Sequence, residues 1–242
     1  MSSIQLLSDE GINVSGGQLF LRIGALCAIV GSLLNVIANL FHPKELIPYD
    51  SAAHLRMIAA DQTWLSDHFL FIAVGAITLW GLLAISDSLA KTPGAFLASL
   101  SARVAMIGTG LMAVFFVVDG YGMKAAGAVW LNAPSSEEAA ALYTAILMSK
   151  LGLGFGSAYF FWYLGLLPLL YGAAMIQGGI FPRWISLTAI MGGVLGVMAG
   201  GGFYLFGYSV VALFSFIGAQ AIIALWTLGA GVVLYRSLGP QT

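Results

Sequence analysis

Six apolar stretches, each long enough to cross a lipid bilayer as a helix, constrain this 242-residue chain more than any other feature. About 20 apolar residues in helical form span the hydrocarbon core. The stretches lie at residues 23–41, 69–86, 103–119, 151–176, 185–206 and 210–234. We therefore predict an all-α fold, a polytopic integral membrane bundle of six transmembrane helices that forms a single domain over residues 1–242.

The composition supports this class and excludes several others. The chain is 60% apolar and 8% charged, whereas a soluble domain carries roughly 25% charged residues. A water-soluble enzyme and a disordered chain are therefore excluded. The net charge of −1, without a basic run, gives no electrostatic footprint for nucleic acid. The single cysteine, Cys27, excludes a disulfide framework and a zinc site made of several thiolates.

The basic residues divide between the two sides of the predicted bundle. The side that carries both termini holds Arg22, Lys91, Arg103, Arg183 and Arg236. The opposite side holds Lys44, Arg56, Lys124 and Lys150. Because the first set lies on short connections next to the spans, the positive-inside rule places both termini in the cytoplasm of a multi-pass cell-membrane protein. Residues 1–18 lack the basic start and apolar run of a cleaved signal peptide, so none is expected.

Two long connections, residues 42–67 and 120–150, lie on the side opposite the termini, and each is expected to contain a short interfacial helix. In the first, Asp50 or Ser51 can cap the helix start. In the second, Ser135 followed by Glu138 matches the capping box. The fold prediction therefore includes two short extracytoplasmic helices beside the six spans.

The first of these helices would align three side chains that bind protons or metals. His54, Asp61 and His68 are spaced seven residues apart, so an unbroken helix places them on one face. The helix can run unbroken into the second span or bend near Ser66. On a straight helix seven residues rise about 10.5 Å, too far for these side chains to ligate one ion.

The first span carries a polar face that ends at a histidine. Ser32, Asn35, Asn39 and His42 follow one another at helical spacing. Because an unpaired amide is costly in hydrocarbon, this face must meet another helix or a wet cavity. Two readings stay open, interhelical hydrogen bonding and one wall of a pocket.

Asp119 is the acid that most needs an explanation. It follows fifteen residues without a charged side chain, near the end of the third span. A carboxyl group at such a place is a functional candidate. It can form a salt bridge, with Lys124 as one partner, or stay protonated and donate a hydrogen bond. Alternatively, Gly120 and Gly122 loosen the helix and leave Asp119 as an ordinary interfacial acid.

His42 closes the first span and His68 opens the second, so the two rings are expected at similar depth. One axial histidine can hold a haem in an apolar slot between helices. His68 is the candidate ligand, His42 a second ligand or a distal group, and Gly75 would leave room for the flat macrocycle. The alternative is a solvated or hydrogen-bonded interfacial histidine.

Two segments resemble the styrene oxide isomerases. These are residues 64–68, WLSDH, at the start of a span, and residues 118–121, VDGY. The resemblance implies haem b on His68, with Asp119 near the substrate and the iron acting as a Lewis acid that opens an epoxide. That family has four spans, and two of its catalytic positions correspond here to Val74 and Gly127. The size and span count also resemble an uncharacterised bacterial family of six-span membrane proteins.

Small and aromatic residues predict how the later spans pack. Gly192, Gly196 and Gly200 lie four residues apart and favour close helix packing, within the bundle or between copies in a homo-oligomer. Pro168 is expected to kink the fourth span. The aromatic run at residues 159–163 is too continuous for one helical face, and we interpret it as lipid and interfacial anchoring.

Three function classes remain. The first is an integral membrane enzyme on a small lipophilic substrate near the outer leaflet, in which Asp119, His42, Asn39 and Asn35 are catalytic or line the cavity and His68 and Gly75 hold the cofactor. A transporter is the second class, although transporters favour broken helices in matching halves. The third is a non-catalytic subunit of a membrane complex.

Overall fold

The computed structural model describes residues 3–43 and 50–239, and the side chains of residues 16–43 and 50–239. These residues form helices and no strand. The elements in order are α1 (Ser3–Phe41), α2 (Ser51–Ala60), α3 (Trp64–Ser88), α4 (Ala95–Phe116), η1 (Val117–Gly122), α5 (Met123–Leu131), α6 (Glu138–Tyr159), η2 (Phe160–Leu166), α7 (Leu167–Gly178), α8 (Arg183–Phe206) and α9 (Val210–Ser237). The elements η1 and η2 are π-helical segments that continue the helices around them.

Six helical rods in the described residues are long and apolar enough to cross a membrane, which confirms the predicted span count. Their bounds are Gly16–Phe41, Trp64–Ser88, Ala95–Leu131, Glu138–Gly178, Arg183–Phe206 and Val210–Ser237. The third and fourth rods have 37 and 41 residues. They are therefore about 55–60 Å long, almost twice the thickness of a bilayer core of about 30 Å.

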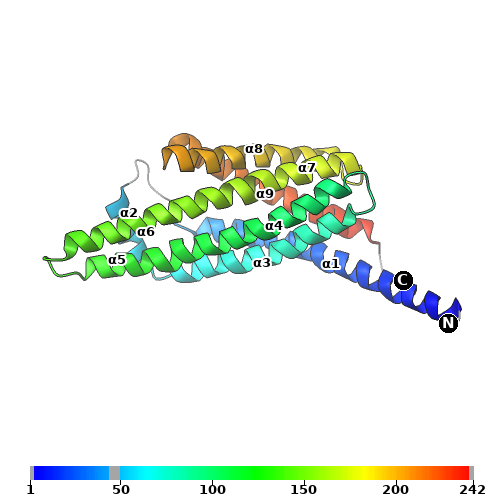
Figure 1. Ribbon diagram of the computed structural model, residues 1–242, viewed down its shortest axis with the longest axis horizontal. Helices are drawn as coiled ribbons and strands as arrows, with labels where there is room; N and C mark the ends of the chain where they lie inside the picture. The colour runs from blue at the N-terminus through cyan, green and yellow to red at the C-terminus, as the bar shows by residue number, and fades with distance from the viewer. Residues whose placement is uncertain (1–2, 44–49, 240–242) are drawn as a thin grey trace.

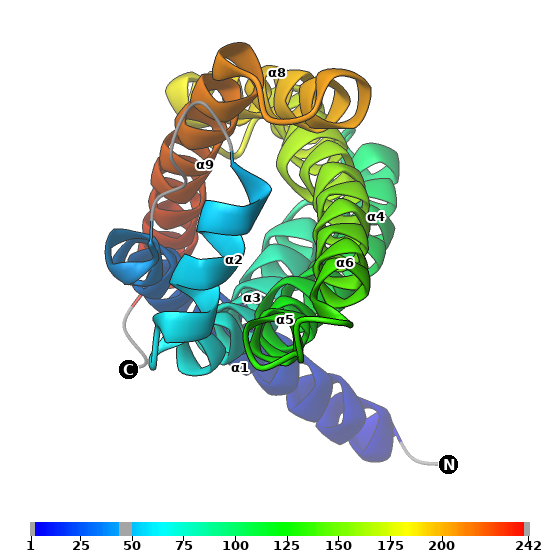
Figure 2. The ribbon, with the colours of Figure 1, turned by 90° about the vertical axis from the view of Figure 1, so that its left-hand side faces the viewer.

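The spans form a ring, and the two longest extend beyond it at one end. Neighbouring elements pack in the order α1, α3, α4, α7, α8 and α9, and α9 returns to α1 (Figure 2). At the end opposite the termini, α5 and the start of α6 project and α2 lies beside them (Figure 1). We call α2, α5 and the first half of α6 the lobe. With the first residue of α3, Trp64, it forms a separate apolar core, which contains Leu55, Ile58, Trp64, Met123, Trp130 and Ala145.

The start of α6 differs from the prediction. The helix begins at Glu138, its N-cap residue is Glu137, and no side chain caps it. Ser135 lies in the preceding turn, so the predicted capping box of Ser135 and Glu138 is wrong. The segment after Pro134 is also not a separate helix, because α6 runs without a break into η2 and α7. By contrast, Asp50 caps α2 as predicted and accepts hydrogen bonds from the backbone N–H groups of Ala52 and Ala53.

Pro168 is accommodated by the π-helical turns of η2. It lies in the first turn of α7, directly after η2. A proline has no N–H to donate and its ring clashes with the preceding turn, and a π-helical segment widens that turn. Tyr159, Phe160 and Tyr163 of the aromatic run lie on one side of the helix and are buried, and our interpretation of the run as lipid and interfacial anchors is wrong for these three.

The glycine face of α8 packs inside the chain. A Cβ atom on Gly196 would lie 2.0 Å from the carbonyl oxygen of Leu164, and one on Gly200 would lie 2.5 Å from the backbone nitrogen of Phe161. Gly192 faces α9 in the same way. These glycines let α8 approach η2 and α9 closely, as small residues do in membranes. A homo-oligomer through this face stays a prediction, and it would have to displace η2 and α9.

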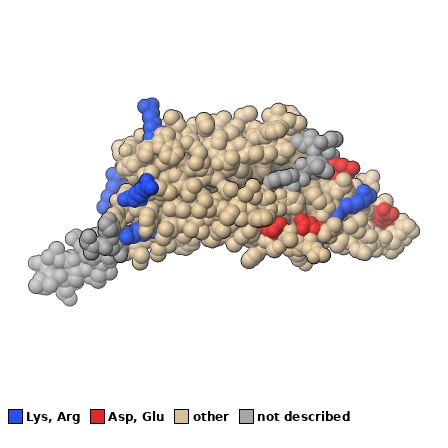
Figure 3. Space-filling model, turned by 180° about the vertical axis from the view of Figure 1, so that it is seen from behind, with Lys and Arg blue, Asp and Glu red and all other residues tan. Residues whose placement is uncertain are grey.

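The charges divide between the two ends of the molecule. Figure 3 shows Lys and Arg at the end that carries the termini, and Asp and Glu toward the lobe, where further basic residues also lie. This is the division between sides that the sequence predicts. The positive-inside rule then places the lobe outside the cytoplasm, and this orientation stays a prediction.

Candidate functional site

A break in the helix separates α2 from α3, directly before the residues of the candidate site. Helix α2 ends at Ala60 and α3 begins at Trp64. Between them Asp61 accepts hydrogen bonds from the N–H and the hydroxyl of Thr63, at 2.8 and 2.9 Å. The predicted continuous face of His54, Asp61 and His68 is therefore wrong, and the bend lies ahead of Ser66. Asp61 serves as a turn residue, whereas both histidines lie against Trp64.

Lys124 stabilises the end of α2. Its Nζ donates to the carbonyl oxygens of Ile58 at 2.9 Å and Ala59 at 3.0 Å, and to that of Asp61. A cation at this place satisfies carbonyls that have no partner within the helix. The predicted salt bridge between Lys124 and Asp119 is therefore wrong, because the ammonium is held by α2 instead.

Replacing Lys124 with methionine is expected to loosen α2. Hydrogen bonds to a charged group contribute about 1.5–3 kcal/mol each when removed singly, and the losses do not add fully. We expect faster hydrogen exchange at the α2 amides, measured by mass spectrometry, and a lower thermal midpoint in detergent. The matched control is Lys150→Met, because Lys150 is exposed. Equal exchange in the two variants would contradict the role of Lys124.

Trp64 is the centre around which the polar residues gather. Its side chain is 1% exposed, and its ring centroid lies 5.3 Å from that of His42, 6.3 Å from that of His54 and 4.3 Å from that of His68. All three histidines of the chain therefore meet one indole. This role of Trp64 was not predicted from the sequence, where Trp64 belongs only to a segment that resembles a known family. The signal that was present is the spacing of four residues between Trp64 and His68, which places both on one helical face.

The π-helical segment η1 places Asp119 in this cluster. The indole Nε1 of Trp64 donates to the carbonyl oxygens of Asp119 and Gly120, both at 3.1 Å. A π-helical turn shifts the hydrogen-bond pattern of the backbone and is frequent at functional sites. Gly120 also allows η1 to approach α3, because a Cβ atom there would lie 2.7 Å from Cβ of His68. Asp119 is therefore a positioned group and not a loose interfacial acid.

His68 and Asp119 form a direct pair. Nδ1 of His68 donates to the carbonyl oxygen of Trp64 at 2.7 Å, and Nε2 lies 2.9 Å from Oδ2 of Asp119. The side chains are 2% and 17% exposed. Because Nδ1 carries a proton, a second proton must lie between Nε2 and the carboxyl oxygen. It makes the pair either an imidazolium with a carboxylate or a neutral imidazole with a carboxylic acid.

His42 completes the cluster, as its expected depth predicted. Its ring centroid is 5.1 Å from that of His68, and its Nδ1 donates to the carbonyl oxygen of Pro43 at 2.9 Å. His42, His68 and Asp119 come from the end of α1, the start of α3 and η1. The structure thus brings together three of the six predicted site residues.

His54 lies on the other side of Trp64 and is 8% exposed. Burial lowers the pKa of His54 below its ordinary value; Asp119 raises the pKa and His42 lowers it further. The neutral ring is therefore favoured in the folded protein. A base whose pKa is lowered by folding stabilises the fold fully above its unfolded pKa and loses that contribution as the pH falls through the folded value.

We therefore expect the thermal midpoint of the protein to fall as the pH is lowered from 7 to 5, because the unfolded His54 takes up a proton near pH 6.5. Thermal unfolding in detergent, followed by circular dichroism at several pH values, measures this. His54→Gln keeps a polar side chain and removes the titration, so its midpoint should change less over the same range. An identical pH dependence in both proteins would contradict this explanation.

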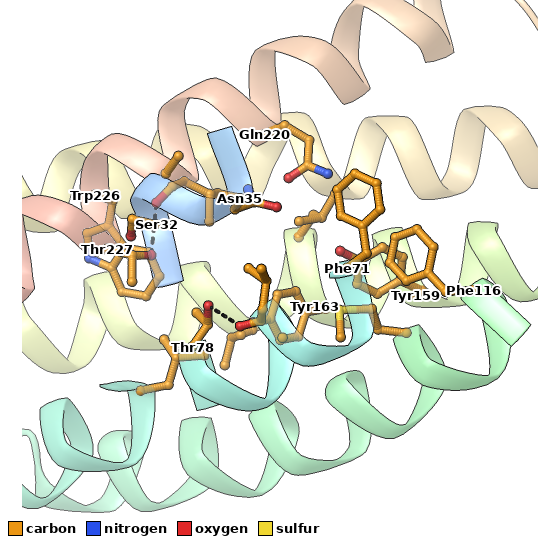
Figure 4. Close-up of a pocket in the computed structure, with 18 residues that line it drawn as sticks. Ser32, Asn35, Phe71, Thr78, Phe116, Tyr159, Tyr163, Gln220, Trp226 and Thr227 are labelled. Carbon is orange, nitrogen blue, oxygen red and sulfur yellow. Dashed lines mark hydrogen bonds between the residues drawn. The ribbon is translucent and has the colours of Figure 1, made fainter. Parts of the chain in front are cut away.

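A polar-lined cavity lies inside the ring of spans, next to the cluster. About 40 Å³ of it is open to the centre of a water-sized sphere, which is room for a few water molecules. Figure 4 shows the side chains around it, from α1, α3, α4, α6, η2, α7 and α9. The polar ones are Ser32, Asn35, Thr78, Tyr159, Tyr163, Gln220, Trp226 and Thr227. In this conformation a larger ligand enters only if side chains move.

Two predicted residues lie at this cavity, and a third supports it. Asn35 and Gly75 line it, and the side chain of Asn39 donates to the carbonyl and amide oxygens of Asn35, at 2.8 and 3.3 Å. The polar face of the first span was expected either to form interhelical hydrogen bonds or to line a pocket. Ser32 and Asn35 line the cavity. Asn39 orients Asn35.

Phe71 and Phe116 separate the cavity from the histidine cluster. Their rings stack with centroids 4.7 Å apart and planes 4° apart, and both residues line the cavity. On their other side Phe71 lies 5.6 Å from the ring of His42 and Phe116 lies 5.8 Å from that of His68.

The residues around His68 do not fit a haem in this arrangement. An axial ligand needs a free nitrogen beside a flat apolar slot, but Nε2 of His68 contacts Asp119. The rings of His42, Trp64 and Phe116 surround His68 at 4.3–5.8 Å. At Gly75, a Cβ atom would lie 1.8 Å from Cε of Met112, so Met112 fills the space that we expected to be open. Haem b on His68 stays a prediction of the resemblance.

The fold and the cluster together define a class: a six-span membrane bundle with a buried histidine–aspartate pair at one end. No family model, curated protein or solved structure matches this chain. The resemblance to the styrene oxide isomerases therefore has no support beyond the two short segments, and function must be argued from the site.

Proposed function

We propose that the chain is an integral membrane enzyme that performs acid–base chemistry on a small lipophilic substrate at the His68–Asp119 pair. The observation that carries the proposal is the 2.9 Å contact between Nε2 of His68 and Oδ2 of Asp119, whose side chains are 2% and 17% exposed. A histidine and a carboxyl group in direct contact form a common device for general acid–base catalysis. Three contacts orient the pair, those of Trp64 with His68, Asp119 and Gly120.

The cavity supplies the binding half of the proposal. Ligand sites are mostly apolar with a few polar groups that fix orientation, and this cavity has both kinds of lining. Trp226 lines it, and its Nε1 is, within residues 16–43 and 50–239, a buried donor without a hydrogen-bond partner. A buried unpaired donor is costly, so a ligand oxygen that accepts from it would bind favourably. A small lipophilic molecule with an acceptor oxygen matches these features, and Phe71 and Phe116 must move before that oxygen can reach the His68–Asp119 pair.

An isomerisation suits a pair that shares one proton. The pair would donate its proton to the oxygen of an epoxide, the carbon–oxygen bond would break, and a hydride would shift to the adjacent carbon. The resulting protonated carbonyl would return its proton to the pair. The reaction needs no oxidant, reductant or co-substrate, and the buried pair ends in the protonation state in which it began.

The proposal can be tested with purified protein in lipid nanodiscs and a panel of aromatic and aliphatic epoxides. Gas chromatography with mass spectrometry would detect the carbonyl product. Loss of a general acid–base group typically lowers the rate by about 10²–10⁴-fold, so Asp119→Asn and His68→Gln are expected to lose activity to that extent. Asp67→Asn is the matched control, because Asp67 is adjacent in sequence but contacts Thr63. Full activity of Asp119→Asn, or no product from any epoxide, would overturn the proposal.

One observation favours a transporter as a second candidate. The cavity is enclosed by a ring of spans and lined by amides from two of them, Asn35 and Gln220. Two of the spans are interrupted by π-helical turns, and irregular helices at a central cavity are typical of transporters. Accumulation of a small solute in proteoliposomes, reduced by Gln220→Leu and unaffected by Asp119→Asn, would favour transport over catalysis.

A further inference from the structure

Three side chains with metal-binding atoms converge beside Trp64. One ring nitrogen of His42, one of His68 and one carboxylate oxygen of Asp119 all lie within 4.8 Å of one another. We propose that these three residues bind one divalent first-row transition-metal ion of the zinc(II) or iron(II) type. The inference rests on the proposed function in placing the ion at the same reacting centre, although metal binding can be measured without turnover.

Both histidines are oriented as metal ligands usually are. Nδ1 of His68 donates to the carbonyl oxygen of Trp64, and Nδ1 of His42 donates to that of Pro43. A ligating histidine almost always donates its second N–H to such an acceptor, which fixes the ring and its tautomer. In the neutral rings this leaves Nε2 of each histidine with a lone pair, and a lone pair is what an ion requires.

The distances require only a small adjustment. Two ligand atoms about 2.0–2.1 Å from one tetrahedral ion lie about 3.3 Å apart, and Nε2 of His68 already lies 2.9 Å from Oδ2 of Asp119. His42 must approach by roughly 1–2 Å to reach the spacing of such ligands. Its position favours this, because it follows the last residue of α1 and is half-buried.

The backbone on which Asp119 lies is held in place. Trp64 donates to the carbonyl oxygens of Asp119 and Gly120, so the indole that packs on the histidines also fixes η1. The carboxylate therefore stays beside His68. Lys124, the lysine closest in sequence, bonds to the end of α2 instead. An ion would supply the positive charge that the proton shared by His68 and Asp119 supplies in its absence.

The ligand set selects the class of ion. Two imidazoles and one carboxylate suit zinc(II) and iron(II), whereas magnesium and calcium prefer oxygen ligands alone. Three protein ligands leave at least one coordination position for water or substrate. The ion would take the place of the proton now shared by His68 and Asp119 and would act as the acid toward a substrate oxygen.

The experiment uses cobalt(II) as the probe, added to full-length protein that has been purified in detergent and treated with a chelator. We expect one equivalent of cobalt per chain, visible d–d absorption, displacement by zinc(II), and a higher thermal midpoint. Removing a residue that only orients a ligand typically weakens metal binding by up to about 100-fold. His42→Gln and Asp119→Asn should weaken cobalt binding by more than that, because each removes a ligand. Size-exclusion chromatography and circular dichroism show whether each variant is folded.

His54→Gln is the matched control. His54 also packs on Trp64 but does not belong to the group of three, so this variant should keep wild-type cobalt affinity. Equal loss in His54→Gln and His42→Gln, or no saturable binding by the wild-type protein, would overturn the site. If protein that binds no cobalt isomerises epoxides, the metal site is rejected and the proposed enzymatic function stands. If the protein binds cobalt but forms no product from any epoxide, the metal site stands and the proposed enzymatic function is rejected.

Discussion

Trp64→Ala is expected to lower the free energy of unfolding by about 3–5 kcal/mol, the range for truncating a fully buried aromatic residue. Trp64 is 1% exposed and belongs to the apolar core of the lobe. Its loss would open a cavity between α2, α3 and η1 and remove the donor to two carbonyl oxygens. Unfolding in detergent, by heat and by titration with a denaturing detergent, measures the change.

Trp64→Phe separates the two contributions. It keeps most of the ring and removes the indole N–H, so the carbonyls of Asp119 and Gly120 lose their donor. Leaving a buried acceptor unpaired costs about 1–3 kcal/mol, less than the full truncation. If Trp64→Ala and Trp64→Phe were equally stable, the indole hydrogen bonds would account for the whole effect and the packing argument would fail. If both matched the wild-type protein, Trp64 would not organise the lobe.

Gly196→Ala is expected to destabilise the bundle by about 3 kcal/mol or more. Inserting a methyl group into a packed interior typically costs about 1–3 kcal/mol. Here the added Cβ would lie 2.0 Å from the carbonyl oxygen of Leu164 and 2.2 Å from its carbon. Because both are backbone atoms, no side-chain rotation relieves the clash, and α8 must move away from η2. A large fall in the thermal midpoint is the expected result.

The matched control lies on the same helix. Gly201 has no atom within 4 Å of the position that its Cβ would occupy. Gly201→Ala should therefore be neutral or stabilising by up to about 1 kcal/mol, because alanine is the better helix former. If Gly196→Ala were as stable as Gly201→Ala, α8 would not pack on η2 as closely as described. The same pair of variants tests whether the glycine face serves the bundle or a second copy of the chain, since an oligomer contact at Gly196 would change the molecular mass in detergent.

Two interpretations of the sequence failed at the π-helical segments. The run at residues 159–163 was interpreted as lipid anchors because a helix cannot bury five consecutive aromatic side chains, but three of the five are buried. Asp119 and Gly120 were left ambiguous, and η1 places Asp119 beside His68. Neither segment was predicted, because a π-helical turn leaves no mark in the hydropathy pattern.

The site residues themselves were partly predictable. His42, His68 and Asp119 stand out because ionisable groups are rare within a membrane and are costly there without partners. The sequence also predicted that His68 and Asp119 converge on one site, and they lie 2.9 Å apart. The partner of Lys124 was not predictable. Lys124 was the expected partner of Asp119 because it is close in sequence. However, the helix break at Asp61 places the end of α2 beside Lys124, and the ammonium donates to carbonyl oxygens there instead.

The amino-acid sequence by itself determined the class of this protein: six apolar helices in a membrane. Lipid offers no hydrogen bonds to the backbone, so a long apolar stretch has essentially one way to satisfy its own peptide groups. The tertiary structure alone decided which polar side chains meet. That outcome depends on a helix break, a π-helical turn and one indole, whose positions are fixed by contacts between segments more than fifty residues apart in the chain.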